Sequence, residues 1–278
     1  MPELPEVETV RRALAVEAIG RRVDAVEVGR DRVARRTSPD AIVAGLTGAE
    51  IERVDRRGKY LLVGLDTGST VMIHLRMSGQ LLIGATETMR PRHCHVMATL
   101  DDGRELRFVD PRTFGEVVVC APGALHRLVP ELSRLGPDPI VDGVDARDIS
   151  TWFRGRRRRL KSMLLDQSII AGIGNIYGDE ICHRARLRPD RPVDSIDRRG
   201  CARLASAVST VLDEAIAAGG STLGDAQYVG LDGVAGSYQR EHRVHARAGE
   251  RCRTCGRGIV RRMSLDQRGT HWCPVCQR

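Results

Sequence analysis

The sequence has few aromatic residues, almost no lysine and a single asparagine. Phenylalanine, tyrosine and tryptophan together make up 3% of the 278 residues, so a platform on which several bases of a single strand stack is poorly supported. Lysine occurs only at Lys59 and Lys161, and asparagine only at Asn175. Because arginine cannot act as an amine acid or base, both lysines are candidate site residues unless they survive by chance. Asn175 is a third candidate because it is equally rare.

Long apolar runs are also missing. No run approaches the roughly 20 residues that cross a bilayer, and the opening Met-Pro-Glu-Leu-Pro-Glu is acidic, unlike a basic signal peptide. Hydrophobic residues make up 41% and charged residues 29% of the chain, which is enough apolar material for a packed core. We therefore expect a cytoplasmic protein with no membrane partner.

The first half of the sequence predicts a β-rich domain led by a helix. The segment Leu4–Ile19 has apolar residues at helical spacing, and Gly20 ends it. Strands are indicated at Tyr60–Leu65 and Thr70–Leu75, joined by a turn typical of a hairpin. We expect a sandwich or a barrel over residues 1–130.

The second half changes to a helical pattern. Proline and glycine mark residues 131–145 as a linker, and residues 146–235 then carry apolar residues at helical spacing. The predicted helices there cover Leu160 to Ile169, Ile176 to Arg186 and Arg199 to Ala217. With a separate C-terminal segment at residues 236–278, the predicted fold class is α+β.

Four of the eight cysteines lie close together at the C-terminus. They form two pairs, Cys252-x2-Cys255 and Cys273-x2-Cys276, separated by 17 residues. This spacing is typical of a structural site in which each pair supplies two thiolates to one tetrahedral zinc ion. Another metal or a redox dithiol pair is the alternative. Four thiolates leave no open position for an activated water, so we expect one structural Zn²⁺ ion.

Basic clusters occur in all three segments. Arg154–Lys161 and Arg53–Lys59 are two of them, and arginines also lie between the cysteine pairs, where Gly269 is predicted to form a hairpin turn. A charge run alone is usually a solvated face. Three clusters with a net charge of +8 nevertheless favour a polyanion, and the low aromatic content favours duplex DNA over a single strand.

The N-terminus is chemically unusual. Removal of Met1 would leave Pro2 as a free secondary amine, and the positive end of the helix beginning just beyond it disfavours a protonated amine. Glu3 and Glu6 oppose that effect. Such an amine can attack a sugar C1′ and give a cationic iminium, which is an electron sink for later elimination. The alternative is an ordinary buried or frayed terminus.

A glycine-bearing turn precedes the second predicted helix of the helical segment. Gly172 and Gly174 let backbone approach a ligand, and a helix that follows Asn175 would present free N–H groups to a phosphate. The alternative, which the sequence supports equally well, is that this turn only connects two helices.

Taken together, these segments resemble bacterial formamidopyrimidine-DNA glycosylases over essentially the whole chain. The matching motifs are, in order, Met1–Thr9, Arg57–Leu62, His74–Gly79, Asp110–Gly115, Gly172–Tyr177 and the terminal four-cysteine finger. The resemblance implies an N-terminal β-sandwich with a leading helix, a helix–two-turn–helix domain and a C-terminal β-hairpin zinc finger. It also implies a monomer that acts on damaged double-stranded DNA in the bacterial cytoplasm, with the nucleoid.

The resemblance implies a bifunctional enzyme that excises oxidised purines such as 8-oxoguanine and formamidopyrimidines, then nicks the strand by β,δ-elimination. Pro2 would be the Schiff-base nucleophile, Glu3 the acid that opens the sugar ring and Lys59 the proton donor in β-elimination. Arg268 would be the donor in δ-elimination. A guanidinium is a poor proton donor, so clamping a phosphate is the safer role for Arg268.

Further residues are implied to bind the DNA. An enzyme of this kind must turn the damaged nucleotide out of the stack, and Met77, Arg112 and Phe114 would fill the space it leaves. Core packing is the plain alternative for Met77 and Phe114. The residues implied to contact the DNA backbone are His93, Arg157, Lys161 and Asn175, and His74 is a further candidate for such a contact.

The chain departs from the family pattern at three places. Arg76 stands where glycine is common, Ser237 lies in an altered Gly-Ser-Tyr segment, and His245 lies in an altered Val-His-Ala-Arg segment. These departures bear on the preferred lesion more than on the lyase chemistry. The alternatives are a glycosylase of the sister branch that prefers oxidised pyrimidines, and a non-catalytic zinc-finger DNA-binding paralogue.

Overall fold

The protein divides into two compact units. The computed structural model describes residues 1–29, 31–224 and 228–278. The first unit comprises Met1–Ser133 and Ala218–Ser237, and the second comprises Arg134–Ala217 and Tyr238–Arg278. The α+β fold class is confirmed. The segment boundaries predicted above stay predictions, and residues 30 and 225–227 within them lie outside the described residues.

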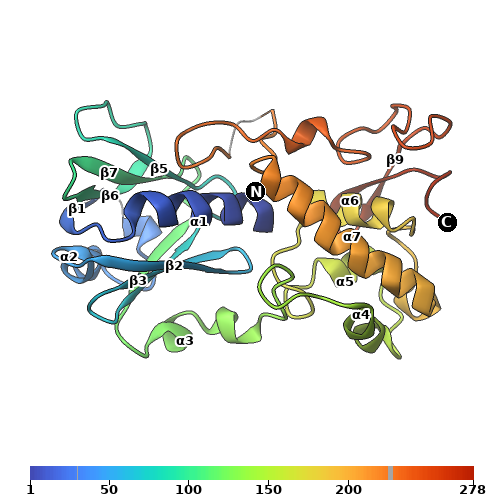
Figure 1. The fold of residues 1–278 in the computed structure, drawn as a ribbon, viewed down its shortest axis with the longest axis horizontal. Helices are drawn as coiled ribbons and strands as arrows, with labels where there is room; N and C mark the ends of the chain where they lie inside the picture. Colours follow the sequence, from blue (N-terminus) through green and yellow to red (C-terminus); the bar gives the residue numbers. More distant parts are fainter. Residues whose placement is uncertain (30, 225–227) are drawn as a thin grey trace. The chain divides into compact units, whose positions relative to one another are not determined.

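Two four-stranded antiparallel sheets build the first unit (Figure 1). One has the order β1-β6-β7-β5 and the other β2-β3-β4-β8. Their strands are β1 (Val23–Val28), β2 (Ile51–Arg57), β3 (Tyr60–Leu65), β4 (Thr70–His74), β5 (Gln80–Ala85), β6 (Cys94–Leu100), β7 (Arg104–Val109) and β8 (Glu116–Cys120). The helices of this unit are α1 (Leu4–Ala18), α2 (Pro39–Leu46) and α3 (Leu125–Leu128). Short 3-10 helices cover Asp31–Val33 and Pro130–Arg134, the second of which ends at the first residue of the second unit.

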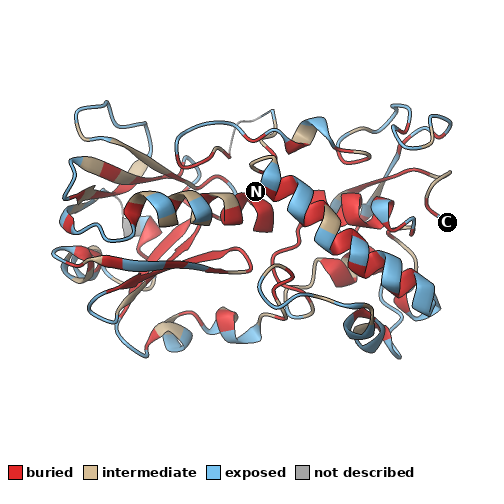
Figure 2. Ribbon diagram, viewed as in Figure 1, coloured by how far each residue is buried: buried red, intermediate tan, exposed pale blue. Residues whose placement is uncertain are grey.

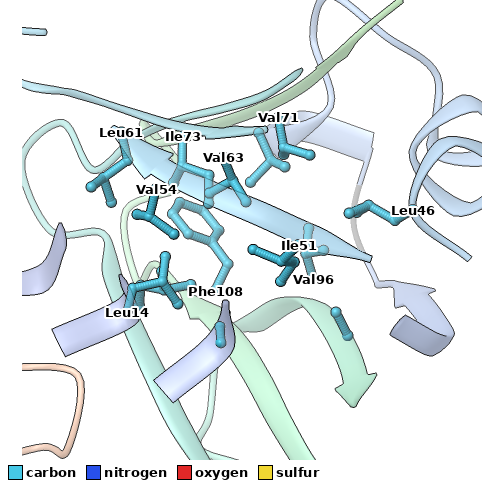
Figure 3. Packing of buried hydrophobic residues seen from close by; sticks show 14 of the residues in the cluster. Leu14, Leu46, Ile51, Val54, Leu61, Val63, Val71, Ile73, Val96 and Phe108 are labelled. Carbon is cyan, nitrogen blue, oxygen red and sulfur yellow. The ribbon is translucent and has the colours of Figure 1, made fainter. Parts of the chain in front are cut away.

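The core of the first unit gathers around the ring of Phe108 from β7 (Figure 3). Leu14 of α1 reaches it, as do Val54 of β2 and Val63 and Ile73 from β3 and β4. Phe108 is only 2% exposed, so truncation to alanine would cost about 3–5 kcal/mol. The helix predicted from apolar spacing is therefore confirmed as α1, with its buried face on this core.

The second unit is helical with a terminal hairpin. It contains α4 (Ala146–Phe153), α5 (Leu160–Leu164), α6 (Asn175–Arg184), α7 (Arg198–Ala217), two 3-10 turns (Val193–Ser195 and Tyr238–Arg240), β9 (Arg261–Leu265) and β10 (Arg268–Trp272). The long helix α7 packs against α4 and α6. Figure 2 shows buried residues alternating with exposed ones along it, as the apolar stripe around Leu204, Val208 and Leu212 predicts.

Two local predictions in the second unit are wrong. The helix expected over Leu160 to Ile169 ends at Leu164, because the Asp166 carboxylate accepts the backbone N–H of Ser168 (3.1 Å) and closes a turn instead. The hairpin turn is not at Gly269. It lies at Asp266 and Gln267, whose φ angles of 48° and 62° both fall in the left-handed region that a two-residue hairpin turn requires.

Gly269 itself lies within β10 and pairs with Ser264 of β9.

Among the helices of the described ranges, none has the length and apolar character needed to span a membrane.

Candidate functional site

The start of α1 holds the first two predicted catalytic residues. Met1 is 46% exposed, whereas Pro2 and Glu3 are buried. Glu3 is the residue that caps α1, and its backbone N–H donates to Glu6 Oε2 (2.8 Å) in a reciprocal capping box. The cap fixes the direction in which the chain enters the helix, and with it the position of the Pro2 nitrogen.

Glu6 also binds a distant segment of the same unit. Its Oε1 accepts the backbone N–H of Ser221 (2.7 Å), which is 215 residues away in the sequence. A Cβ on Gly220 would lie 2.8 Å from Glu6 Oε1, and Gly220 has a φ of 77°, so this position requires glycine. The second role of Glu6 was missed by the sequence analysis, although the Glu3/Glu6 spacing signals the capping box.

Lys59 lies in the two-residue turn between β2 and β3, after Gly58 with a φ of 58°. Arg56 holds this turn to α1: its Nη1 donates to the Gly58 carbonyl (2.8 Å), and its Nε donates to Glu8 Oε2 (2.9 Å). Burial alone would raise the pKa of Glu8, but hydrogen bonds from Arg11, Arg56 and Arg12 outweigh it and lower that pKa to about 2. A charged Glu8 thus positions the Lys59 turn.

His74, at the end of β4, is buried and neutral. Burial and the nearby charges of Arg76 and Lys59 lower its pKa to about 3. Its Nδ1 accepts the backbone N–H of Arg76 (2.9 Å), so the proton of the neutral ring is on Nε2. His74 is therefore built as a neutral hydrogen-bond donor beside two cations.

The buried carboxylate of Asp110 joins the two turns that carry the residues predicted to fill the duplex. Its Oδ1 accepts from the hydroxyl of Ser78 (2.5 Å) and from the backbone N–H of Arg112 (3.2 Å). Its Oδ2 accepts the backbone N–H of Gly115 (2.6 Å). The turn after β4 and the turn before β8 are thus held as one piece. Sequence analysis assigned Asp110 no role, although it opens one of the quoted motifs.

The tips of these turns expose apolar side chains. Met77 is 39% and Phe114 is 37% exposed, which does not fit the core-packing alternative. The guanidinium carbon of Arg112 lies 4.9 Å from the centre of the Phe114 ring.

Three non-glycine residues at or beside these tips adopt left-handed backbone. They are Arg76, Thr113 and His93, with φ angles of 52°, 54° and 63°. His93 is exposed, and its carbonyl accepts the backbone N–H of Asp110 (3.0 Å). Strained backbone of this kind persists where the surrounding structure enforces it, and it clusters at functional sites.

In the second unit, two of the predicted DNA-backbone residues converge on the hairpin. Lys161 is 2% exposed, and its ammonium donates to Asp179 Oδ1 (2.6 Å), Thr270 Oγ1 (3.0 Å) and the Gly269 carbonyl (3.2 Å). Asn175, the first residue of α6, donates from Nδ2 to the same carbonyl (3.1 Å). The next residue toward the turn is Arg268, which is exposed.

Asp179 is the centre of a buried network that the sequence analysis missed. Its Oδ2 accepts from His245 Nδ1 (2.9 Å), His271 Nδ1 (3.0 Å) and the backbone N–H of His271 (3.1 Å). Burial alone would raise the pKa of Asp179, but these hydrogen bonds and the charge of Lys161 lower it. His245, one of the residues at which the chain departs from the family pattern, therefore helps to hold the carboxylate that pairs with Lys161.

Arg157, by contrast, lies open to solvent. Its side chain is 93% exposed, and its nearest ion pair is with Asp194 at 3.6 Å. Such an exposed pair is weak, so the Arg157 side chain is available to another anion.

The four C-terminal cysteines come together as the spacing predicts. Their Sγ atoms all lie within 4.8 Å of one another, and the pairs Cys252–Cys276 and Cys255–Cys273 are each 3.8 Å apart. These separations are far longer than a disulfide bond. A Cβ on Gly258 would lie 2.6 Å from Cys273 Sγ, so the backbone closes tightly around the sulfurs. The arrangement forms a candidate metal centre.

Comparison with known proteins identifies the family. Residues 1–117 match the model of the formamidopyrimidine-DNA glycosylase N-terminal domain, and residues 135–227 match that of the formamidopyrimidine-DNA glycosylase H2TH domain. The chain belongs to the formamidopyrimidine-DNA glycosylase family. The curated member from Laribacter hongkongensis is 42% identical and the one from Herpetosiphon aurantiacus 41% identical, each over the full length of both chains.

Solved structures of the family agree. The structure of the Fpg protein from Thermus thermophilus is similar with a TM-score of 0.87 and 41% identity, over 99% of this chain and 98% of that one. The Lactococcus lactis Fpg in complex with DNA containing an abasic site is similar with a TM-score of 0.90 and 30% identity, over 99% of each chain. The resemblance noted in the sequence is thereby confirmed.

Proposed function

We propose that this chain excises oxidised purines, 8-oxoguanine and formamidopyrimidines, from duplex DNA and then cuts the strand at the abasic site. Glycosylase activity belongs to the family, and lyase activity is typical of it. Relatives from Lactococcus lactis have been solved with DNA containing an abasic site and with DNA containing Fapy-dG. Damaged double-stranded DNA is accordingly the partner.

The observation that carries the catalytic proposal is the arrangement at the start of α1. Pro2 directly precedes the helix cap Glu3, and the same helix holds the Lys59 turn through Arg56 and Glu8. Once Met1 is removed, the Pro2 nitrogen attacks C1′ of the damaged nucleotide. The N–C1′ bond forms as the glycosidic bond breaks, and the departing base takes up the proton that the Pro2 nitrogen loses. Glu3 protonates the sugar ring oxygen as the ring opens to the iminium.

The resulting iminium draws electrons from the sugar and makes elimination possible. Lys59 donates a proton in β-elimination, and exposed Arg268 assists δ-elimination by holding the phosphate that leaves. A guanidinium that binds phosphate with two parallel hydrogen bonds suits this role better than proton donation does.

The remaining site residues hold the distorted duplex. Met77 and Phe114 replace the stacking lost when the nucleotide leaves, and Arg112 offers donors to the orphaned base. The residues that contact phosphates are His74, His93, Arg157 and Asn175. Buried Lys161 supports the DNA contact by holding Gly269 and Thr270, the residues that follow Arg268 in β10, because its three donors already have acceptors.

The cysteine centre fits a structural Zn²⁺ ion. A tetrahedral zinc with Zn–S bonds of about 2.3 Å places its sulfurs about 3.8 Å apart, and the two paired separations have this value. Cys252, Cys255, Cys273 and Cys276 would hold the ion, which would supply folding energy to the hairpin and no activated water.

Borohydride trapping tests the catalytic proposal. The wild-type chain, shown by mass spectrometry to lack Met1, is incubated with an 8-oxoguanine duplex and reduced, and a covalent protein–DNA complex is expected. Pro2→Gly, or a verified N-terminal tag, should reduce base excision while duplex binding survives. Failure of the processed wild type to form the complex would defeat the proposal.

A parallel duplex with an oxidised pyrimidine decides the lesion class. A Lactococcus lactis relative has been solved with DNA containing an oxidised pyrimidine, so this alternative is a real one. Faster excision of the pyrimidine would place the chain with the sister branch. A DNA substrate also favours the expected location with the nucleoid in the cytoplasm, and we expect the chain to act as a monomer.

A further inference from the structure

Arg76 has a backbone conformation that its own side-chain contacts do not justify. Its φ of 52° lies in the left-handed region, which costs an arginine conformational free energy that glycine would not lose. It lies in the turn closed by the hydrogen bond from the Gly79 N–H to the Leu75 carbonyl (2.9 Å). A residue kept in such a conformation at a functional turn points to a role outside folding.

The ion pair that Arg76 makes within the chain is weak. Its Nη2 lies 3.9 Å from Glu116 Oε2, and its side chain is 40% exposed. Arg36 already holds the carboxylates in this region: it donates to Glu116 Oε1 (2.7 Å) and to both oxygens of Glu131 (2.7 and 2.9 Å). An exposed pair at such a distance contributes little to stability.

A neutral hydrogen-bond donor lies beside Arg76, and the two nearby carboxylates, Glu116 and Glu131, are already paired with Arg36. The charges of Arg76 and Lys59 both act on buried His74, whose neutral ring carries its proton on Nε2. The backbone N–H of Arg76 donates to this ring (2.9 Å), and Arg76 directly precedes the exposed Met77 of the same turn. A phosphate, which is singly charged and accepts several hydrogen bonds, satisfies such a group of donors.

We propose that Arg76 binds a DNA phosphate beside the position at which Met77 enters the duplex. The inference rests on the proposed function, since it takes duplex DNA as the ligand. Arg76 would then bind DNA directly, through its own side chain, and would not merely support the neighbouring Met77. A contact to a base in the groove is the competing possibility, and it predicts a different dependence on salt and on sequence.

The test measures binding of the full chain to a duplex with a tetrahydrofuran abasic site over a series of salt concentrations. The variants are Arg76→Gln, which keeps a side chain but loses the charge, Arg76→Lys, which keeps the charge, and Arg76→Gly. Arg22→Gln is the matched control, because exposed Arg22 already has Glu50 (3.3 Å) and the Gly48 carbonyl (2.6 Å) as partners.

Loss of one phosphate contact should make the slope of log K against log salt shallower by about 0.9 for Arg76→Gln and Arg76→Gly. Affinity should fall about three- to tenfold near 0.1 M salt, equally for all four bases opposite the lesion site. Arg76→Lys should keep the slope, and Arg22→Gln should match wild type. The melting temperature of Arg76→Gly should equal or exceed that of wild type.

Three results would overturn the inference. An unchanged slope for Arg76→Gln excludes a phosphate contact, and a loss that depends on the opposite base would assign Arg76 to base reading. A lower melting temperature for Arg76→Gly would show that Arg76 serves folding. Failure of the proposed function is distinguishable, because wild type would then bind the duplex without forming a trapped complex.

Discussion

The most discriminating stability prediction concerns Asp179→Asn in the second unit. The substitution keeps the shape of the side chain but removes its charge, and Lys161, with 2% of its surface exposed, loses the carboxylate 2.6 Å from its ammonium. Breaking a buried ion pair by removing one partner costs about 3–5 kcal/mol, because the other charge stays buried without compensation. The free energy of unfolding of this unit should fall by that amount.

Tryptophan fluorescence during urea unfolding provides the assay. Both tryptophans, Trp152 of α4 and Trp272 of β10, lie in the second unit, so their signal reports on that unit. The control is Asp190→Asn, because Asp190 pairs with Arg188 (2.7 Å) while both side chains are partly exposed. This control should cost less than about 1 kcal/mol.

A double variant separates burial of charge from loss of packing. Adding Lys161→Met to Asp179→Asn removes the isolated cation, so the pair of substitutions should cost less than the sum of the two single ones. The reasoning would be refuted if Asp179→Asn lost under about 1 kcal/mol, or if the double variant lost the full sum.

The contribution of Asp179 to the free energy of unfolding depends on pH, and the direction of its pKa shift gives the sign. Its pKa is lowered by the hydrogen bonds and by Lys161, which outweigh burial. Its contribution to stability is therefore complete above the unfolded pKa of about 3.9 and is lost as pH falls through the lower folded value. Wild type should lose this contribution only in acid, whereas Asp179→Asn should lack it at every pH.

The pKa of about 2 at Glu8 implies about 3 kcal/mol of stability that is present above pH 4.5 and lost toward pH 2. Acid titration of Glu8→Gln by circular dichroism should show no such loss. Asp110→Ala should lower the free energy of unfolding of the first unit by about 2–3 kcal/mol, because the buried donors of Ser78 and Gly115 lose their acceptor. If Asp110→Ala cost no more stability than Asp102→Ala at the surface, this prediction would be wrong. A strong chelator should release one zinc per chain, measured by a colorimetric dye, and abolish duplex binding; binding unaffected by complete metal loss would exclude a structural role.

Local signals in the sequence were sufficient for the elements that close within a few residues. The apolar residues from Leu4 onward predicted α1, because helical periodicity is visible in residues three and four positions apart. The cysteine spacing predicted the clustered thiols, because each pair forms its own short turn. The turn residues of the hairpin were misplaced, since Asp266 and Gln267 adopt left-handed backbone that glycine would have signalled more clearly.

Contacts between distant segments could not be predicted in this way. The bond between Glu6 and Ser221 spans 215 residues, and no periodicity connects its ends. The same is true of Asp179, which meets His245 and His271 only after the chain has folded. For such groups the sequence supplies residue types, and only the packed structure supplies partners.

The two units support their exposed site residues by the same physical means. In each, a buried carboxylate with several donors fixes a short segment of backbone, and a residue proposed to touch DNA lies in or next to that segment. Asp110 fixes the turn that carries Phe114, and Asp179, through Lys161, fixes the strand residues that follow Arg268. A carboxylate is suited to this task because it accepts several hydrogen bonds at once and loses much when one is broken. The exposed tips can therefore carry left-handed backbone and unburied apolar surface, since the cost is offset by bonds made beneath them. It follows that substitutions at the carboxylates should lower stability and DNA binding together, whereas those at the tips should lower binding alone.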